Sequence, residues 1–265
     1  MVTKMHMARS SLTITLSVWR ALFFREALSR LFSSRGSWFW LLAEPVFHMA
    51  YLAFIYTVIR VHTIGGIDTV IWLFGGMLAF FMFRRTGSQV MDGVSANLAL
   101  FSYRQVKPID AVLTRGFLEG FLTTINAIAL LAGAALFGHS ISPEDTLAVL
   151  EAFLGLWLLG MGFGLMTSVA IELVPELGRV VRLIMMPLYL ISGVIFPISS
   201  VPQPYREWLL LNPVTHGLEA VRLGFASHYY AVPELSISYL YGCALVSIFL
   251  GLALHRRFAL RLATQ

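Results

Sequence analysis

The sequence is poor in charge, and this excludes an ordinary soluble domain. Only 12% of its 265 residues are charged, whereas 58% are hydrophobic. A soluble domain carries about 25% charged residues, so the composition favours a chain surrounded largely by lipid. The net charge is nevertheless +5. Because the basic residues lie between apolar runs rather than on one face, they indicate cytoplasmic loops of a membrane protein rather than nucleic-acid binding.

Motifs for catalysis and metal binding are also missing. Cys243 is the single cysteine, which excludes an intrachain disulfide and a cysteine metal cluster and leaves a packing role. The sequence contains neither the phosphate loop G-x-x-x-x-G-K-[ST] nor H-E-x-x-H, and its seven histidines are scattered. We therefore expect a non-catalytic chain with no metal and no cofactor of its own. The N-terminus has no short apolar region followed by a small-residue cleavage site, so we expect no signal peptide.

Six apolar stretches approach the length of about 20 residues that a helix needs to cross a bilayer. They are Ser37–Ile59, Ile67–Phe83, Ala111–Phe137, Leu147–Ile171, Val180–Pro197 and Ser236–Leu254. The second is short, and we expect its helix to continue past Arg84 and Arg85, whose side chains would reach the membrane interface. Pro187, Gly193 and Pro197 predict a kinked or broken fifth helix. The predicted fold is an all-α integral membrane protein with six transmembrane helices.

The placement of lysine and arginine predicts the orientation of these helices. If both termini are cytoplasmic, all but three of the 19 basic residues lie on the cytoplasmic side. The three on the outer side are Arg60, Arg206 and Arg222. Cytoplasmic loops of membrane proteins are enriched in Lys and Arg. We therefore expect a multi-pass protein with both ends in the cytoplasm.

The first 36 residues form a region of their own, ahead of a transmembrane domain over residues 37–265. From Ser10 to Arg35 the chain has no proline, and aromatic residues such as Trp19 and Phe23 stand among arginines. This composition predicts a helix on the inner leaflet, held by aromatic anchors and by attraction to anionic lipid.

Residues 201–230 are apolar although they fall on the outer side. Asn212 is a plausible N-cap, with Pro213 at the first position of a short helix. Glu219 and Arg222, three residues apart, could neutralise one another on that helix. Because each piece is too short to span, we predict a re-entrant helical hairpin before the last span. The alternative is an amphipathic surface loop.

Glu44, His48 and Glu119 are ionisable residues inside the predicted spans, where a charge is costly and is a candidate for function. Glu44 and His48 lie one helical turn apart in the first span. Both a functional role and simple pairing with a neighbouring helix stay open for them. For Glu119 we expect pairing with Arg115, one turn earlier.

Residues 93–110 form a cytoplasmic loop in which aromatic and basic residues alternate. From Asn97 onward the loop reads NLALFSYRQVKPID. Exposed aromatics among basic residues suit docking to a soluble partner. We expect a short helix here, ended by Pro108, that passes motion into the attached spans. The alternative is a solvated loop whose aromatics rest against lipid headgroups.

The stretch from Leu100 to Asp110 closely resembles KpsM-type permeases, the inner-membrane subunits of capsular polysaccharide ABC exporters. Supporting matches spread along nearly the whole chain. They are Glu44-Pro45 with His48, Pro175-Glu176, Pro187-Leu188-Tyr189 with Ile195-Phe196-Pro197, Asn212-Pro213 with His216 and Glu219, and Gly251-Leu252-Ala253-Leu254. Asn212-Pro213 and its neighbours recur across the wider class of type-two ABC exporter permeases.

This resemblance implies an assembly. Two copies of the chain would form a homodimer in a bacterial inner membrane, and two ABC ATPase subunits would bind ATP and magnesium. Periplasmic adaptor and outer-membrane proteins would take the lipid-linked polysaccharide onward. The ATPase-coupling residues would be Asn97, Phe101, Tyr103, Arg104, Lys107, Pro108 and Asp110, with Glu176 in a second cytoplasmic turn over Pro175–Arg179.

A conduit at the dimer seam could be lined by aromatic residues, because sugar rings stack on aromatic faces. The candidates are Phe39, Trp40, Phe47, Tyr51, Phe80, Phe81 and Phe83; the alternative for each is contact with lipid or packing between helices. Arg84 and Arg85 would suit an acidic capsule at the cytoplasmic entrance. Competing functions are export of O-antigen or teichoic acid, proton-coupled transport through Glu44 and His48, and membrane-embedded polymer synthesis.

Overall fold

The computed structural model describes residues 11–32, 36–59 and 63–263. The chain is mostly helical. Its elements are α1 (Ser11–Phe32), α2 (Ser37–Val58), β1 (Thr63–Ile64), β2 (Ile67–Asp68), α3 (Thr69–Met91), the 3-10 helix η1 (Ser95–Ser102), α4 (Pro108–Leu136), α5 (Thr146–Leu173), α6 (Glu176–Ile191), the 3-10 helix η2 (Ile198–Ser200), α7 (Tyr205–Leu209), α8 (Pro213–Phe225), α9 (Ile237–Arg257) and α10 (Ala259–Ala263). Arg60, one of the basic residues expected outside, lies beyond the described residues.

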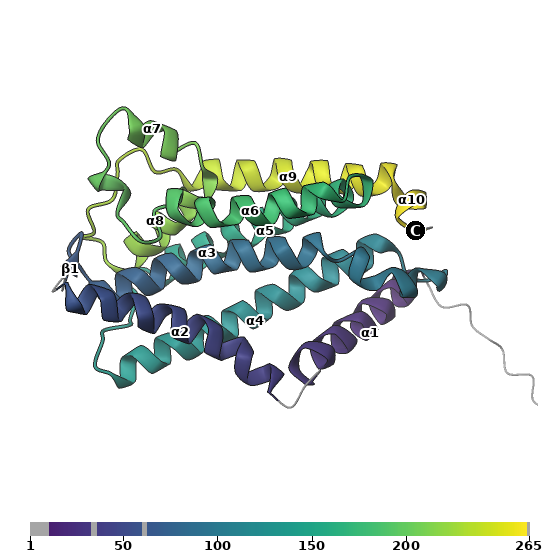
Figure 1. The fold of residues 1–265 in the computed structure, drawn as a ribbon, viewed down its shortest axis with the longest axis horizontal. Helices are drawn as coiled ribbons and strands as arrows, with labels where there is room; N and C mark the ends of the chain where they lie inside the picture. The colour runs from purple at the N-terminus through teal and green to yellow at the C-terminus, as the bar shows by residue number, and fades with distance from the viewer. Residues whose placement is uncertain (1–10, 33–35, 60–62, 264–265) are drawn as a thin grey trace, which may run out of the picture.

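Each of the six apolar stretches overlaps one long helix of the structure. Helices α2, α3, α4, α5, α6 and α9 run alternately between two ends of the molecule (Figure 1). Three of them, α4, α5 and α9, are long and apolar enough to cross a membrane by length and composition, among the residues that the structure describes. As expected, α3 continues past Arg84 and Arg85 as far as Met91.

The two ends of the molecule differ in what they carry. One end holds the short hairpin of β1 and β2, in which Thr63 pairs with Asp68, together with α7 and α8 (Figure 1). The other end holds η1, α10 and the C-terminus (Figure 1). Helix α1 starts at this second end and packs along α4. The N-terminal helix predicted from the sequence is therefore present and lies outside the main bundle.

Helix α5 lies between α3 and α9, and glycine allows its close approach to both. A side chain at Gly160 would place its Cβ 2.7 Å from the backbone oxygen of Phe83 in α3. At Gly162, the Cβ would lie 2.7 Å from the backbone nitrogen of Ile248 in α9. Small residues of this kind let helix backbones pack closely in membrane proteins. The glycines of α5 thus allow α3 and α9 to pack closely on either side of it at the centre of the bundle.

The fifth apolar stretch is broken, as its glycine and prolines predict. Helix α6 contains Pro187 and ends at Ile191. Gly193 follows with φ +75°, a conformation that a side chain would strain. A Cβ there would also meet the Ile198 side chain at 2.6 Å. The chain consequently leaves the helix well before Pro197.

Residues 201–230 contain two short helices, α7 and α8. The Asn212 side chain accepts a hydrogen bond from the backbone of Val214 at 3.1 Å, and Pro213 is the first residue of α8, so the predicted cap is confirmed. The predicted pair is confirmed as well: Arg222 Nη1 lies 2.6 Å from Glu219 Oε1, and both side chains are fully buried. Arg222 also donates to the backbone oxygens of Gly193 and Val194, at 2.8 and 2.9 Å.

Candidate functional site

The predicted coupling segment, residues 93–110, connects α3 to α4. Its short helix is the 3-10 helix η1, which ends at Ser102. Pro108 does not end this helix, contrary to our prediction. It is the first residue of α4, where the missing N–H of proline costs nothing and its fixed φ suits the first turn.

Half of the predicted coupling residues are buried and hold the segment in place. Asn97 Nδ2 donates to the backbone oxygen of Gly93 at 2.9 Å, and Asn97 Oδ1 accepts from Arg25 of α1. The Phe101 side chain is buried in a cluster with Val94 and with residues of α4, α5 and α10. The segment is therefore anchored both to the bundle and to α1.

Asp110 makes a second link between the segment and α1. Its Oδ2 accepts from the backbone nitrogen of Lys107 at 3.1 Å, which closes the first turn of α4. Its Oδ1 accepts from Trp19 Nε1 of α1 at 2.8 Å. The buried carboxylate of Asp110 thus accepts a backbone N–H at the start of α4 and also positions α1 through Trp19.

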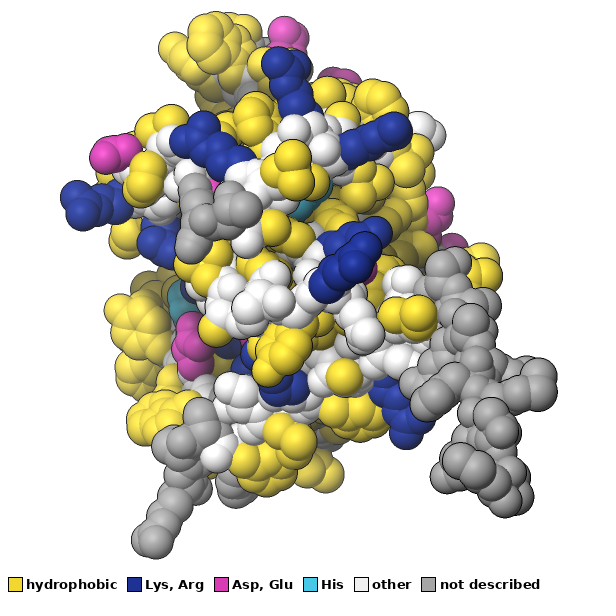
Figure 2. Space-filling view, turned by 90° about the vertical axis from the view of Figure 1, so that its right-hand side faces the viewer, with side chains coloured by type: hydrophobic (Ala, Val, Ile, Leu, Met, Phe, Trp, Pro, Cys, Tyr) yellow, Lys and Arg dark blue, Asp and Glu magenta, His cyan; other side chains and the backbone are white. Residues whose placement is uncertain are grey.

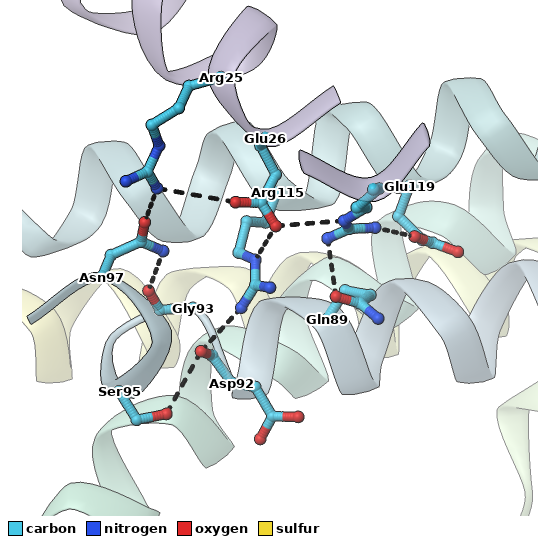
Figure 3. Close-up of polar contacts among 10 residues, drawn as sticks. Arg25, Glu26, Gln89, Asp92, Gly93, Ser95, Asn97, Arg115 and Glu119 are labelled. Atoms are coloured by element: carbon cyan, nitrogen blue, oxygen red, sulfur yellow. Dashed lines mark hydrogen bonds and ion pairs between the residues drawn. The ribbon is translucent and has the colours of Figure 1, made fainter. Parts of the chain in front are cut away.

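Glu26 is the centre of an ion-pair network between α1 and the bundle (Figure 3). Its Oε1 lies 2.7 Å from Arg115 Nε of α4 and 3.1 Å from Arg30 Nε, one turn along α1. Its Oε2 lies 3.7 Å from Arg25. Burial raises the pKa of Glu26, but the charges and hydrogen bonds of Arg115 and Arg30 together outweigh burial and hold this pKa below its ordinary value.

The expected pair of Glu119 with Arg115 is wrong. Glu119 instead pairs with Arg30 of α1, and Arg115 is taken by Glu26 and by the backbone oxygen of Asp92, 2.8 Å from its Nη1. The sequence offered a partner at i and i+4 on one helix, but an arginine from another helix reaches the buried carboxylate. Arg30 also donates to Gln89 of α3 at 2.7 Å.

The other predicted coupling residues are exposed at the same end. Tyr103 is 64% exposed, and Arg104 and Lys107 are exposed beside it. Glu176 is exposed at the start of α6, whose Arg182 is bound to Asp92 at the end of α3 by a 2.8 Å ion pair. Figure 2 shows this end of the molecule, where basic side chains are dispersed among fewer acidic ones.

The seven aromatic residues predicted for a conduit fall into two groups. Phe39, Trp40, Phe47 and Tyr51 of α2 are at least half exposed. Phe80, Phe81 and Phe83 are buried within the subunit and pack between helices, which was the alternative for them, and a place at a dimer seam stays a prediction. Phe80 packs edge-on against Tyr189 of α6 at 5.1 Å. A run of aromatics on one helix cannot distinguish these two surroundings, because helices on several sides cover α3.

Glu44 and His48 both contact neighbouring helices. Glu44 Oε2 lies 3.0 Å from Arg85 Nη2 of α3, and His48 Nε2 lies 3.2 Å from the Tyr189 hydroxyl of α6. These contacts are those of the packing interpretation. Among the described residues, no three His, Cys, Asp or Glu side chains gather as metal ligands.

The α1 network is the part of the site that sequence reasoning missed. Glu26 is the one acidic residue between Ser10 and Arg35. An isolated carboxylate among arginines on an apolar helix is a signal for a fixed ion pair, although its partner in α4 could not be named from spacing.

Comparison with known proteins assigns the chain to a family. Residues 17–226 match the family model described as "ABC-2 type transporter". The chain belongs to the ABC-2 type transporter family. Within this family it is 32% identical to the polysialic acid transport protein KpsM of Escherichia coli over 250 residues, covering 94% of this chain and 96% of KpsM. It is 29% identical over 252 residues to the capsule polysaccharide export inner-membrane protein CtrC of Neisseria meningitidis, covering 94% of each chain. It is 26% identical over 251 residues to BexB of Haemophilus influenzae, which carries the same description, covering 95% of this chain and 94% of BexB.

Proposed function

We propose that this chain is the membrane-spanning permease subunit of an ATP-driven exporter of capsular polysaccharide in a bacterial inner membrane. The names of its relatives support capsule as the cargo. Energy comes from a separate ATPase, since Lys4 and Lys107 are the only lysines and neither follows a glycine as a phosphate loop requires. A homodimer, adaptor proteins and outer-membrane partners complete the assembly.

Six helices cross the membrane in this proposal: α2, α3, α4, α5, α6 and α9. Their alternating directions support it (Figure 1). The end that carries η1 and α10 faces the cytoplasm, as its basic side chains favour (Figure 2). Helix α1 then lies on the inner leaflet, and α7 and α8 form the re-entrant hairpin near the outer leaflet. If only α4, α5 and α9 crossed the membrane, apolar helices such as α2 would be left in water.

One observation carries the proposal: the coupling segment is rigidly held yet presents exposed side chains. Asn97, Phe101 and Asp110 fix its position, while the side chains of Tyr103 and Arg104 are exposed. A surface that must pass mechanical work needs both properties, because a loose loop would absorb the motion of a docked ATPase. The contact chemistry, an aromatic beside an arginine, is typical of protein interfaces.

The test is co-purification of the tagged chain with the Walker-motif ATPase encoded beside it. Tyr103→Ala should weaken this complex or leave ATP hydrolysis without export. Tyr205→Ala is the matched control, because Tyr205 is similarly exposed, at 67%, but lies on α7 at the opposite end. An equal loss of export in both variants, or labelling of a cysteine at position 103 only from the periplasm, would overturn the proposal.

Proton-coupled transport finds no comparable support. Glu44 is bound to Arg85 and His48 to Tyr189, and both contacts are those expected from packing between helices. Export of O-antigen or teichoic acid would use the same fold. Capsule is preferred because the relatives at 25% identity and above over most of the chain include several named for capsule export.

A further inference from the structure

Arg84 and Arg85 are neighbours on α3, but they differ in what they contact. Arg85 forms a 3.0 Å ion pair with Glu44. Both guanidinium groups lie near the Phe81 ring, at 5.7 Å for Arg84 and 5.9 Å for Arg85, but within the described residues Arg84 has no carboxylate partner. Its side chain is half-buried. A guanidinium partly removed from water is costly without an opposite charge, so Arg84 is prepared for an anion that the subunit itself does not supply.

Arg84 also lies where two grooves meet. The first groove, of about 590 Å³, lies between α2, α3 and α6, and its ionisable lining residues are His48, Arg84, Arg182 and Tyr189. None of its lining residues in the described chain is acidic. The second groove, of about 530 Å³, lies between α1, α2, α3 and α4. Arg84 and Ser88 line both grooves.

The other arginines of these grooves are already engaged. In the second groove Arg30, Arg85 and Arg115 are each paired with a glutamate. In the first, Arg182 is held by Asp92. Among the described arginines that line these grooves, Arg84 is therefore the one without a carboxylate partner, and its N–H donors can bind a ligand.

The surroundings of Arg84 suit an oxyanion carried on a larger molecule. Ser88 follows one turn later on the same helix face and adds a hydroxyl donor. Met185, Met186 and Leu190 give the first groove an apolar wall, and its volume is in the range of small-molecule sites. The arginine fork matches the two oxygens of a carboxylate or phosphate. Arg84 lies seven residues before the end of α3, about 10 Å from the end with the coupling segment.

We propose that Arg84 binds an oxyanion of the exported molecule at the junction of the two grooves, whereas Arg85 is a structural partner of Glu44. The inference rests on the proposed function and names its substrate class as acidic. The oxyanion is either the carboxylate of an acidic sugar or the phosphate of a lipid headgroup. Entry from the cytoplasmic end would bring this group to Arg84 before the polymer reaches Phe47 and Tyr51, the exposed aromatics farther along α2.

The experiment measures equilibrium binding to the purified complex of the full chain with its ATPase. One arm uses fluorescent oligogalacturonate, with its methyl-esterified form as the uncharged probe. The other compares nanodiscs of phosphatidylglycerol with nanodiscs of phosphatidylcholine. Both binding measurements are made with the natural chain, with Arg84→Gln and Arg84→Lys, and with the matched control Arg85→Gln. Because Arg84 makes no ion pair in the described chain, Arg84→Gln should fold normally, which co-purification and size-exclusion chromatography check.

For one of the two anionic probes, we expect Arg84→Gln to bind about tenfold more weakly, the loss of one charge-assisted contact. Arg85→Gln should stay within about twofold, and Arg84→Lys should retain part of the affinity. Loss of oligogalacturonate binding identifies a sugar carboxylate, and loss of phosphatidylglycerol preference identifies a headgroup phosphate. Equal weakening in both Gln variants, unchanged binding in Arg84→Gln, or no preference for either charged probe overturns the inference. Failure of the proposed function shows separately, as absent export by the natural complex.

Discussion

Glu26→Gln should loosen α1 from the bundle without unfolding it. Glutamine keeps the shape of the side chain but removes the charge that Arg115 and Arg30 contact at 2.7 and 3.1 Å. Glu26 is only 8% exposed, so solvent replaces little of this interaction. Hydrogen bonds to charged groups contribute about 1.5–3 kcal/mol each. Arg30 keeps Glu119 and Arg115 keeps the oxygen of Asp92, so we expect a net cost of about 2 kcal/mol.

The release of α1 can be followed with one introduced thiol. Leu22 lies on the covered side of α1 and is 6% exposed. Because Cys243 is the only native cysteine, Leu22→Cys in a Cys243→Ser background gives a single reporter. The thiol at position 22 reacts with an added maleimide only when α1 separates from α4. A cost of about 2 kcal/mol raises the separated population, and with it the labelling rate, about 30-fold.

Arg20→Gln is the control for this measurement, because Arg20 is an exposed charge on the same helix. It should leave the labelling rate within about twofold of the parent. If Glu26→Gln labelled no faster than Arg20→Gln, the network would not be what holds α1. The same conclusion would follow if labelling were already fast in the parent protein.

Two further substitutions test other parts of the structure, and a change of pH tests the Glu26 network again. Asp110→Asn leaves one carbonyl oxygen for the two donors of Lys107 and Trp19, and should lower the free energy of unfolding by about 1 kcal/mol, measured by thermal unfolding in detergent. Arg222→Ala leaves Glu219 charged, buried and unpaired, and should cost about 3–5 kcal/mol in the same assay. The pKa of Glu26 in the folded protein is lowered from the ordinary value of 4.5. The stability that the charged Glu26 gives to the packing of α1 is therefore complete above pH 4.5. It is lost only as the pH falls through the lowered pKa of the folded protein. The protection of α1 amides from hydrogen exchange should therefore exceed that of Glu26→Gln equally at about pH 7 and pH 5, and the difference should vanish only well below pH 4.5.

The helices could be predicted from the sequence because the residues of each helix, or those next to it in the chain, indicate where it lies. Apolar length places α2, α4, α5 and α9, and the cap at Asn212 followed by Pro213 places the start of α8. The Glu219–Arg222 pair was predictable for the same reason, since both members lie on one helix three residues apart. Signals of this kind depend only on neighbours in the chain.

The contacts between helices could not be predicted in this way. Glu119 had a local arginine at the right spacing, yet a residue from α1, 89 positions away in the chain, is its partner. Likewise, Phe80 and Phe47 are both aromatic residues of apolar helices, but one is fully buried and the other mostly exposed. Which face of an apolar helix is covered depends on its neighbours, and in lipid the hydrophobic pattern does not mark that face.

The placement of the coupling segment suggests how work could reach the transport path. Asn97 and Asp110 of the segment contact Arg25 and Trp19 of α1, so in the proposed exporter a push on the exposed Tyr103 would move α1 and the start of α4 together. The α1 network extends through Gln89 into α3, one and a half turns beyond Arg84. Since α3 carries the segment at its end and Arg84 along its length, displacement at the ATPase surface and access to the anion site would be movements of the same helix. Coupling would then require no separate relay, only that α3, α1 and the start of α4 move relative to α6.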